Sequence, residues 1–222
     1  MSFNIAIDGP AGAGKSTIAR QAARELSFIY VDTGAMYRAI ALGLLRLGTD
    51  VEDEAALKEA LSRINVGIGY ENGEQQVYLN GENVSGLIRT EEVSSMTSVS
   101  SSKACVRAKL TDLQRELAAR ENVLMDGRDI GTVILPQAQL KIYLTASVAV
   151  RAKRRYLELQ AKGEKCDLAE TERDIEERDY RDMHRDVAPL RQAEDAVLVD
   201  SSDMQIDEVV ACIVKLAQER MS

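Results

Sequence analysis

Short apolar runs alternate with amphipathic segments along most of the chain. Five runs are apolar almost throughout and end at acidic or small residues, as buried parallel strands do; they lie at residues 3–8, 28–32, 122–125, 140–144 and 196–200. Apolar residues at helical spacing predict helices at residues 18–26, 35–47, 52–64, 102–120, 147–162, 167–187 and 205–220, and a serine-rich helix that starts at Thr90. This alternation predicts an α/β fold in which helices cover both faces of a five-stranded parallel sheet.

The pattern changes after the third predicted helix. Residues 66–70 and 75–80 read as two strands around Asn72-Gly73, a pair that favours a tight hairpin because both positions tolerate positive φ. A second turn then leads into the apolar residues at 84–88. We therefore expect a small antiparallel meander, inserted between helices of an otherwise alternating chain.

Composition limits the classes of function. The 222 residues, of which 45% are hydrophobic, can form one large domain with a sizeable core. A net charge of −8, with no Trp and few other aromatic residues, argues against a nucleic-acid-binding surface. No signal peptide is recognisable, and charges interrupt every apolar stretch well before the length of a membrane span. We expect a cytoplasmic protein with no membrane segment, whose three cysteines are reduced packing residues.

The first predicted strand runs through a glycine-rich loop into a helix. The loop has the spacing G-x-x-x-x-G-K-[ST] and consists of Gly9, Pro10, Ala11, Gly12, Ala13, Gly14, Lys15, Ser16 and Thr17. Its glycines let successive backbone N–H groups surround phosphate oxygens, and the positive end of the helix dipole adds to the attraction. Lys15 can reach the β- and γ-phosphates, while the Ser16 hydroxyl can bind Mg²⁺. A plain connecting turn is the alternative, but spacing, residue types and context favour binding of a nucleoside triphosphate.

Further charged residues follow the other predicted strands. Ligands of doubly wound sheets bind outside the carboxyl ends of the strands, so we expect one edge to carry the Gly9 loop, Asp32-Thr33, residues 126–129 and Asp200. Arg38 lies one turn inside the helix that follows Asp32, and we favour a functional role for it. The alternative is a helix start capped by Asp32 or Thr33, with Arg38 in solvent.

Two more clusters are candidates for binding the phosphate acceptor. Asp126-Gly127-Arg128-Asp129 ends a buried strand and must open onto a cleft, because unpaired buried charge is costly; a structural ion pair between Arg128 and one of the aspartates is the competing interpretation. Arg178, Asp182 and Arg185 share one face of a predicted helix. A surface ladder of ion pairs, each contributing about 0.2–0.5 kcal/mol, is the alternative there.

Residues 151–155 form a basic cluster on the helix after the fourth strand. Acidic residues balance the basic ones across this part of the chain, so a polyanion-binding surface is excluded. A solvated helix face is the plain interpretation, but the cluster suits a mobile lid whose arginines close over a triphosphate. His184, the only histidine, has no cysteine or partner nearby in sequence that would support a metal site or a hydrolase, and we assign it no catalytic role.

These groups favour one type of phosphoryl acceptor. A sugar hydroxyl would need a base to remove its proton, whereas a nucleoside monophosphate attacks with an oxygen that is already ionised. The difficulty is then to bring two anions together, and several arginines meet that need. A GTP-binding switch protein is a rival of another class, but it would need a guanine-reading N-K-x-D motif, which the sequence lacks.

Four segments together resemble the bacterial cytidylate kinases: residues 9–17, 32–38, 126–132 and 178–182. The similarity covers essentially the whole chain in order, whereas the loop alone would indicate only a P-loop nucleotidase. The resemblance implies the fold of P-loop nucleoside monophosphate (NMP) kinases and a single kinase domain over residues 1–222. Within it, residues 65–90 would form a β-rich NMP-binding insertion and residues 151–168 an approximate helical lid.

The resemblance also implies an activity: transfer of the γ-phosphate of ATP, with Mg²⁺, to CMP or dCMP. The implied CMP-binding residues are Thr33, Ser98, Arg107 and Asp129 around the cytosine, Arg38, Arg128 and Arg185 at the phosphate, and Arg178 and Asp182 at the ribose. The implied catalytic residues are Lys15, Arg128, Arg154 and Arg185, with Arg155 as an alternative to Arg154 for the main lid contact. We expect a monomer.

Cytosine chemistry agrees with this assignment. The Asp129 carboxylate can accept a hydrogen bond from the amino group of cytosine, but it would repel the O4 atom of uracil, and Arg107 supplies donors. The nearest rival is another P-loop kinase, acting on UMP, AMP or a small hydroxyl acceptor.

Overall fold

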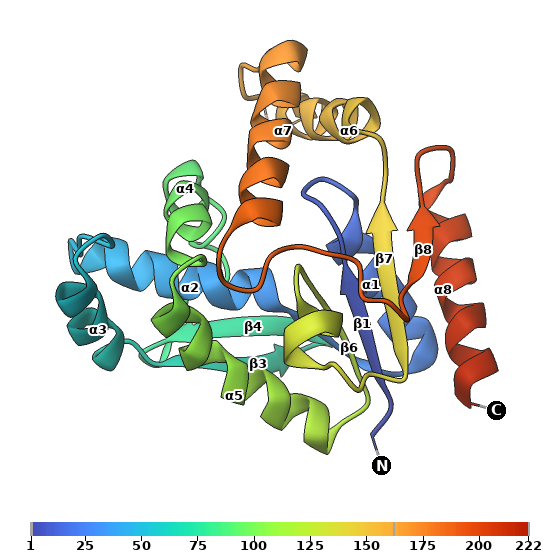
Figure 1. Ribbon diagram of the computed structural model, residues 1–222, viewed down its shortest axis with the longest axis horizontal. Coiled ribbons are helices and arrows are strands. Elements are labelled where there is room, and N and C mark those ends of the chain that lie inside the picture. The colour runs from blue at the N-terminus through green and yellow to red at the C-terminus, as the bar shows by residue number, and fades with distance from the viewer. Residues whose placement is uncertain (1, 162, 222) are drawn as a thin grey trace. The chain divides into compact units, whose positions relative to one another are not determined.

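The computed structural model describes residues 2–161 and 163–221, and its elements follow the predicted alternation (Figure 1). The strands are β1 (Asn4–Asp8), β2 (Ile29–Asp32), β3 (Val66–Glu71), β4 (Glu74–Leu79), β5 (Glu82–Asn83), β6 (Val123–Gly127), β7 (Leu140–Thr145) and β8 (Val197–Asp200). The α-helices are α1 (Lys15–Leu26), α2 (Thr33–Arg46), α3 (Glu54–Ser62), α4 (Glu91–Ser100), α5 (Ala104–Arg120), α6 (Val148–Ala161), α7 (Leu168–His184) and α8 (Ile206–Met221). A short π-helix, η1 (Ile130–Ile134), was not predicted. Among the described helices, none is long and apolar enough to cross a membrane.

The predicted five-stranded parallel sheet is confirmed, with the strand order β2-β6-β1-β7-β8. Its middle strand, β1, pairs in parallel with β6 and with β7, and the register sets Asp8 opposite Gly127 on one side and Tyr143 on the other. Parallel strands end at the same edge of a sheet. The loops that follow β1 and β6 therefore leave the sheet side by side, and both contain predicted site residues.

The chain forms two compact units, one made of Met1–Ile29 and Glu121–Ser222 and the other of Tyr30–Arg120. In the first unit, α1 and α8 pack against each other, α1 also contacts β6, and α8 contacts β7. The strands are buried because their side chains are apolar on both faces, as at Ile5, Ile7 and Leu124, which are fully inaccessible to solvent. The sheet of this unit is thus the scaffold for the loops at its carboxyl edge.

The second unit is built around α2, which contacts α3, α4, α5 and the β3–β4 hairpin. Met36, Ile40 and Leu44 recur at helical spacing along α2 and are fully buried. Gly43 lies on the same helix and contacts Ile64. A Cβ atom at position 43 would lie only 2.8 Å from Ile64 Cδ1, so the contact requires a glycine there. The small residue lets the end of α3 pack directly on α2.

The predicted hairpin is confirmed, but the third strand of the meander is not where the pattern suggested. Asn72 and Gly73 both have positive φ (53° and 77°) in the turn between β3 and β4. The third strand, which pairs with the other side of β4, is the two-residue β5, and residues 85–88 lie in turns, with the Leu87 N–H donating to Val84 O. The Ser85 hydroxyl accepts the Val77 N–H, which ends the ladder at that point.

Two helix starts follow the capping chemistry read from the sequence. Asp32 caps α2, because its carboxylate accepts the Ala35 N–H at 2.8 Å, and Thr90 caps α4 in the same way through Val93. Of the two candidate caps of α2, Asp32 is therefore the one used. Thr33 becomes the first residue of the helix, with a buried side chain.

Candidate active site

The loop between β1 and α1 has the shape that the glycine motif requires. A Cβ atom at Gly9 would lie 1.9 Å from the carbonyl oxygen of Leu144, so only glycine fits against β7 at that point. Gly14 precedes α1 in the left-handed conformation (φ 83°), and no side chain caps the helix. The first turn of α1 contains no acidic residue either. The N-terminal N–H groups of α1 are thus left to an anion.

Lys15 is buried at the start of α1. Its Nζ atom donates to the carbonyl oxygens of Gly9 and Pro10, at 2.8 and 2.7 Å. Burial, followed by the charge of Arg128, lowers the pKa of Lys15 well below its usual value, although nearby aspartates oppose the shift. A bound phosphate would favour the charged ammonium and offer it stronger acceptors than backbone carbonyls.

Ser16 and Asp126 form a pair of oxygen ligands next to this loop. The Ser16 hydroxyl donates to Asp126 Oδ2 at 3.0 Å, and Asp126 is buried at the carboxyl end of β6. Hydroxyl and carboxylate oxygens are the ligands that Mg²⁺ takes in proteins, together with phosphate oxygens and water. No cluster of three or more His, Cys, Asp or Glu side chains suited to a metal occurs among the described residues.

The two clusters predicted for the acceptor meet in the first unit. Arg128 Nε donates to Asp182 Oδ2 at 2.9 Å, and Arg185 Nη2 lies 3.6 Å from Asp129 Oδ1. The side chains of Arg128 and Asp182 are 20% and 17% exposed, so they do not form the surface ladder considered as an alternative. The partner of Arg128 in this pair is on α7, whereas the sequence suggested an aspartate beside it.

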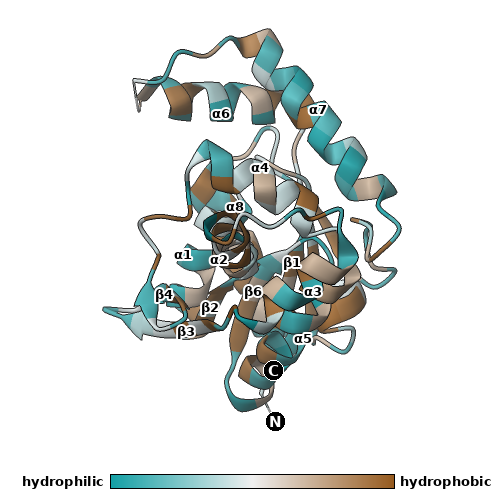
Figure 2. Cartoon of the chain, turned by 90° about the vertical axis from the view of Figure 1, so that its left-hand side faces the viewer, coloured by the Kyte–Doolittle hydropathy of each residue, from teal (hydrophilic) through white to brown (hydrophobic). Residues whose placement is uncertain are grey.

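The charge state of Asp182 follows from these contacts. Burial disfavours its ionised form, but Arg128, Arg178 and Arg185 outweigh burial and lower the pKa of the carboxyl. The α7 helix that carries it is hydrophilic along most of its length (Figure 2). The face predicted from helical spacing therefore consists of an ionised carboxylate held between arginines.

Asp8 supports the loop that follows β6, and its role was not foreseen. Its carboxylate accepts the N–H groups of Ile130 and Gly131 at 2.8 and 2.7 Å. Complete burial raises the pKa of this carboxyl to about 6, with the two hydrogen bonds acting in the opposite direction. The only signal in the sequence was an acid that interrupts an apolar strand just before the loop. Asp8 fixes the backbone directly after Asp129.

The basic cluster at 151–155 differs from the expected row of lid arginines. Arg151 is buried and forms an ion pair with Asp179. Arg154 donates to the hydroxyl and carbonyl oxygens of Ser201, while Arg155 pairs with Glu158 on the same helix. For Arg151 the interpretation as part of a solvated face is wrong, because its side chain is only 4% exposed; the lid stays a prediction. The catalytic role of Arg154 stays a prediction.

Three of the four residues predicted around the cytosine, Thr33, Ser98 and Arg107, belong to the second unit, whereas Asp129 belongs to the first. Arg107 is buried, donates to Ser101 O at 3.2 Å, and lies 5.3 Å from the centre of the Tyr37 ring. Arg38 curls back over Gly34, where an added Cβ atom would lie 3.1 Å from its Nη1 atom. It is therefore not extended into solvent, as the alternative held. Ser98 is partly exposed on α4.

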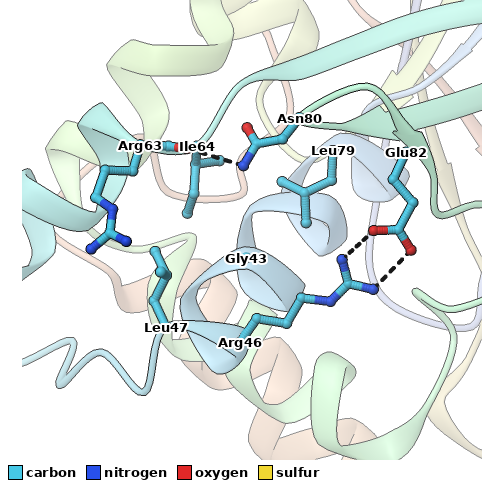
Figure 3. A pocket seen from close by; sticks show the side chains of 8 residues that line it. All are labelled: Gly43, Arg46, Leu47, Arg63, Ile64, Leu79, Asn80 and Glu82. Carbon is cyan, nitrogen blue, oxygen red and sulfur yellow. Dashed lines mark hydrogen bonds and ion pairs between the residues drawn. The ribbon is translucent and has the colours of Figure 1, made fainter.

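A cavity of about 280 Å³ in the second unit contains none of the predicted site residues (Figure 3). Arg46 and Glu82 line it and bind each other through both guanidinium nitrogens. Leu47, Ile64 and Leu79 form its apolar part. The Arg46 guanidinium in this cavity is already bound by the Glu82 carboxylate, so the cavity is poorly suited to bind an anionic nucleotide.

Comparison with known proteins decides the family. A sequence model described as cytidylate kinase matches residues 5–219, nearly the whole chain. The chain belongs to the cytidylate kinase family. It is 49% identical over 218 residues to the cytidylate kinase of Lactobacillus johnsonii, covering 98% of this chain and 95% of that one. It is 48% identical over 221 residues to the cytidylate kinase of Leuconostoc mesenteroides subsp. mesenteroides, covering 100% and 99%.

Solved structures of low sequence identity share the fold. An uncharacterized protein from Eubacterium ventriosum superposes with a TM-score of 0.54 at 11% identity, covering 98% of this chain and 99% of that one. A shikimate kinase from Acinetobacter baumannii superposes with a TM-score of 0.50 at 16% identity, covering 99% and 94%. At such identities the likeness concerns the fold alone.

Proposed function

We propose that the protein transfers the γ-phosphate of ATP to CMP or dCMP, giving ADP and CDP or dCDP. Membership of the cytidylate kinase family supports the proposal. The observation that carries it is that Ser16 of the P-loop binds Asp126, two residues before Arg128, which in turn binds Asp182 on the acceptor side. A triphosphate at the loop and a phosphate at Arg128 would therefore share one field of positive charge.

The residues of the first unit would act by positioning and neutralising charge. The acceptor phosphate of CMP is already ionised, so no general base is required, and the obstacle is repulsion between two anions. We assign Lys15, Arg128, Arg154 and Arg185 to offsetting that repulsion. The backbone of Gly9, Pro10, Ala11, Gly12, Ala13 and Gly14, with Lys15, Ser16 and Thr17, would hold ATP.

Mg²⁺ would be held by Ser16, with Asp126 beside it, and by the phosphates. When bound, the ion supplies further charge neutralisation at the β- and γ-phosphates. The Ser16–Asp126 hydrogen bond would then be exchanged for contacts with the ion or with its water.

Recognition of CMP would divide between its parts. We assign the cytosine to Asp129 and Arg107, with Thr33 and Ser98 near it, the ribose to Arg178 and Asp182, and the phosphate to Arg38, Arg128 and Arg185. An ionised Asp129 would accept from the cytosine amino group and repel uracil. The lid at residues 151–168, the NMP-binding role of residues 65–90, a monomeric state and a cytoplasmic location also stay predictions.

A coupled assay of ADP release tests the proposal. ATP and Mg²⁺ are supplied with CMP, dCMP, UMP or AMP in turn, and kcat/KM is compared. We expect CMP or dCMP to be preferred over UMP by about 10²-fold or more, since a buried polar mismatch discriminates strongly. Faster turnover with UMP or AMP would overturn the assignment of the acceptor while leaving the P-loop chemistry intact.

A further inference from the structure

Two buried side chains, Arg151 of α6 and Asp179 of α7, bind the backbone of the first half of the P-loop. The Ala11 N–H donates to Asp179 Oδ1 at 3.3 Å, and the Ala11 carbonyl oxygen accepts from Arg151 Nη1 at 2.8 Å. The two side chains also bind each other, with Arg151 Nη1 2.6 Å from Asp179 Oδ2. Both polar groups of one P-loop residue are thus engaged by a single ion pair.

This ion pair is built into the structure and is not a surface contact. The side chains of Arg151 and Asp179 are only 4% and 10% exposed, and Arg151 Nε donates to the carbonyl oxygen of Ala146 at 2.9 Å. A Cβ atom at Gly12 would lie 3.2 Å from Arg151 Cβ and 3.7 Å from Ile175 Cδ1. The loop backbone therefore packs closely against both helices, and Arg151 has a fixed geometry at three acceptors.

Asp179 precedes the residues of α7 that face the acceptor side. One turn further along α7, Asp182 binds Arg128, and Arg185 at the end of the helix approaches Asp129. A shift of α7 that improves these acceptor-side contacts must move Asp179, and with it the backbone of Ala11. The geometry therefore offers one continuous helix, α7, that contacts both halves of the predicted site.

We propose that Arg151 and Asp179 are positioning residues that set the shape of the P-loop and couple binding of ATP to binding of CMP through α7. The inference builds on the proposed function, since it assumes a triphosphate at the P-loop and CMP at the α7 face. CMP bound there orders α7. The conformational-entropy cost of ordering α7 is then smaller when ATP binds, so ATP binds more tightly. By linkage, ATP must then tighten CMP binding by the same factor.

The test is calorimetric titration with the β,γ-imido analogue of ATP and Mg²⁺, with and without saturating CMP. For the wild type we expect CMP to tighten analogue binding by about 5-fold or more, within the usual range of coupling between sites. In Asp179→Asn the amide oxygen can still accept the Ala11 N–H, but the ion pair is lost. We expect that variant to bind the analogue several-fold more weakly and to lose the coupling, with CMP binding alone nearly unchanged.

Two further variants separate coupling from stability. Asp179→Asn leaves Arg151 buried without its carboxylate, which can destabilise the fold, so the double variant Arg151→Met/Asp179→Asn removes both charges and should also lack coupling. Glu116→Gln removes the exposed ion pair of α5 with Arg120, away from every residue assigned to the site, and serves as the control, with wild-type coupling expected. Unaltered coupling in both Asp179 variants, or its absence in the wild type, would overturn the inference. Failure of the wild type to bind or phosphorylate CMP would instead refute the proposed function.

Discussion

The predicted site residues of the two units differ in the contacts that the structure shows for them. In the first unit, charged side chains bind one another in buried or partly buried pairs: Arg128 with Asp182, Arg185 with Asp129, and Arg151 with Asp179. In the second unit, Arg107 is held by a backbone carbonyl and an aromatic ring. The difference fits the chemistry proposed for each. Moving phosphate between anions needs fixed charge, whereas reading a base needs oriented hydrogen-bond donors and acceptors.

The largest effect is expected at Lys15 in the first unit. Lys15→Met removes the ammonium that would neutralise the β- and γ-phosphates, and kcat should fall by about 10³-fold or more. The change is measured by steady-state assay at saturating ATP and CMP. Lys58→Met, which removes an exposed ion pair with Glu54 on α3, should keep wild-type activity. A near-normal kcat of the Lys15 variant would contradict the proposed role of the P-loop in the reaction.

The buried charge of the first unit should also appear in stability. The pKa of Asp8 is raised from 3.8 to about 6, so the folded protein binds this proton more tightly than the unfolded chain does. The free energy of unfolding therefore falls as pH rises, by about 2 kcal/mol from this group between about pH 4 and about pH 6, out of about 3 kcal/mol over the whole titration. Asp8→Asn cannot ionise and should lack that part of the fall. Urea denaturation at both ends of this pH range, on both proteins, provides the comparison; parallel pH profiles would contradict the shift.

The preference for CMP over UMP should depend on Asp129, the residue of the first unit that is assigned to the cytosine. Asp129→Asn replaces a carboxylate by an amide that can rotate to accept from cytosine or donate to uracil. The preference for CMP over UMP should fall by about 10²-fold, measured as the ratio of the two kcat/KM values. An equal loss of activity with both acceptors would mean that Asp129 only supports Arg185.

Sugar recognition should show a smaller, one-sided effect. Asp182→Ala removes the partner of Arg128 and should raise KM for CMP by about 30-fold, an effect of about 2 kcal/mol. KM for ATP should hardly change. Asp174→Ala, an exposed change on the same helix, is the matched control. Equal weakening of ATP and CMP binding would show that the α7 face is structural and does not bind the ribose of CMP.

The smallest effect is expected in the second unit at its cavity. Arg46→Ala removes an exposed ion pair with Glu82, and such pairs contribute about 0–1 kcal/mol. Unfolding free energy should change by less than about 1 kcal/mol, and KM for CMP should stay within about twofold. A large rise in KM would reassign the cavity to the active site.

Sequence predicted most of the architecture, because hydrophobic periodicity and the glycine motif are local signals. It placed all five strands of the parallel sheet and the Asn72-Gly73 hairpin. It missed η1, whose residues carry no helical period, and misplaced the third strand of the meander, where a Ser85 hydroxyl ends the ladder.

The partners of charged residues could not be predicted in the same way. Arg128 pairs with Asp182 and Asp179 with Arg151, across separations of 54 and 28 residues, which only the tertiary fold brings together. Helical spacing did identify the α7 face at Arg178, Asp182 and Arg185, since that relation is local. It could not tell which arginines of the 151–155 cluster point inward.

Phosphorus NMR of a reaction mixture containing ATP, Mg²⁺ and CMP tests the central claim most directly, because it separates phosphoryl transfer from hydrolysis. The account predicts that the γ-phosphate signal of ATP is lost while the signals of CDP and ADP grow together, with no matching growth of inorganic phosphate. If inorganic phosphate appears in place of CDP, or CMP stays unchanged while ATP is consumed, the protein does not use CMP as its acceptor and the account is wrong.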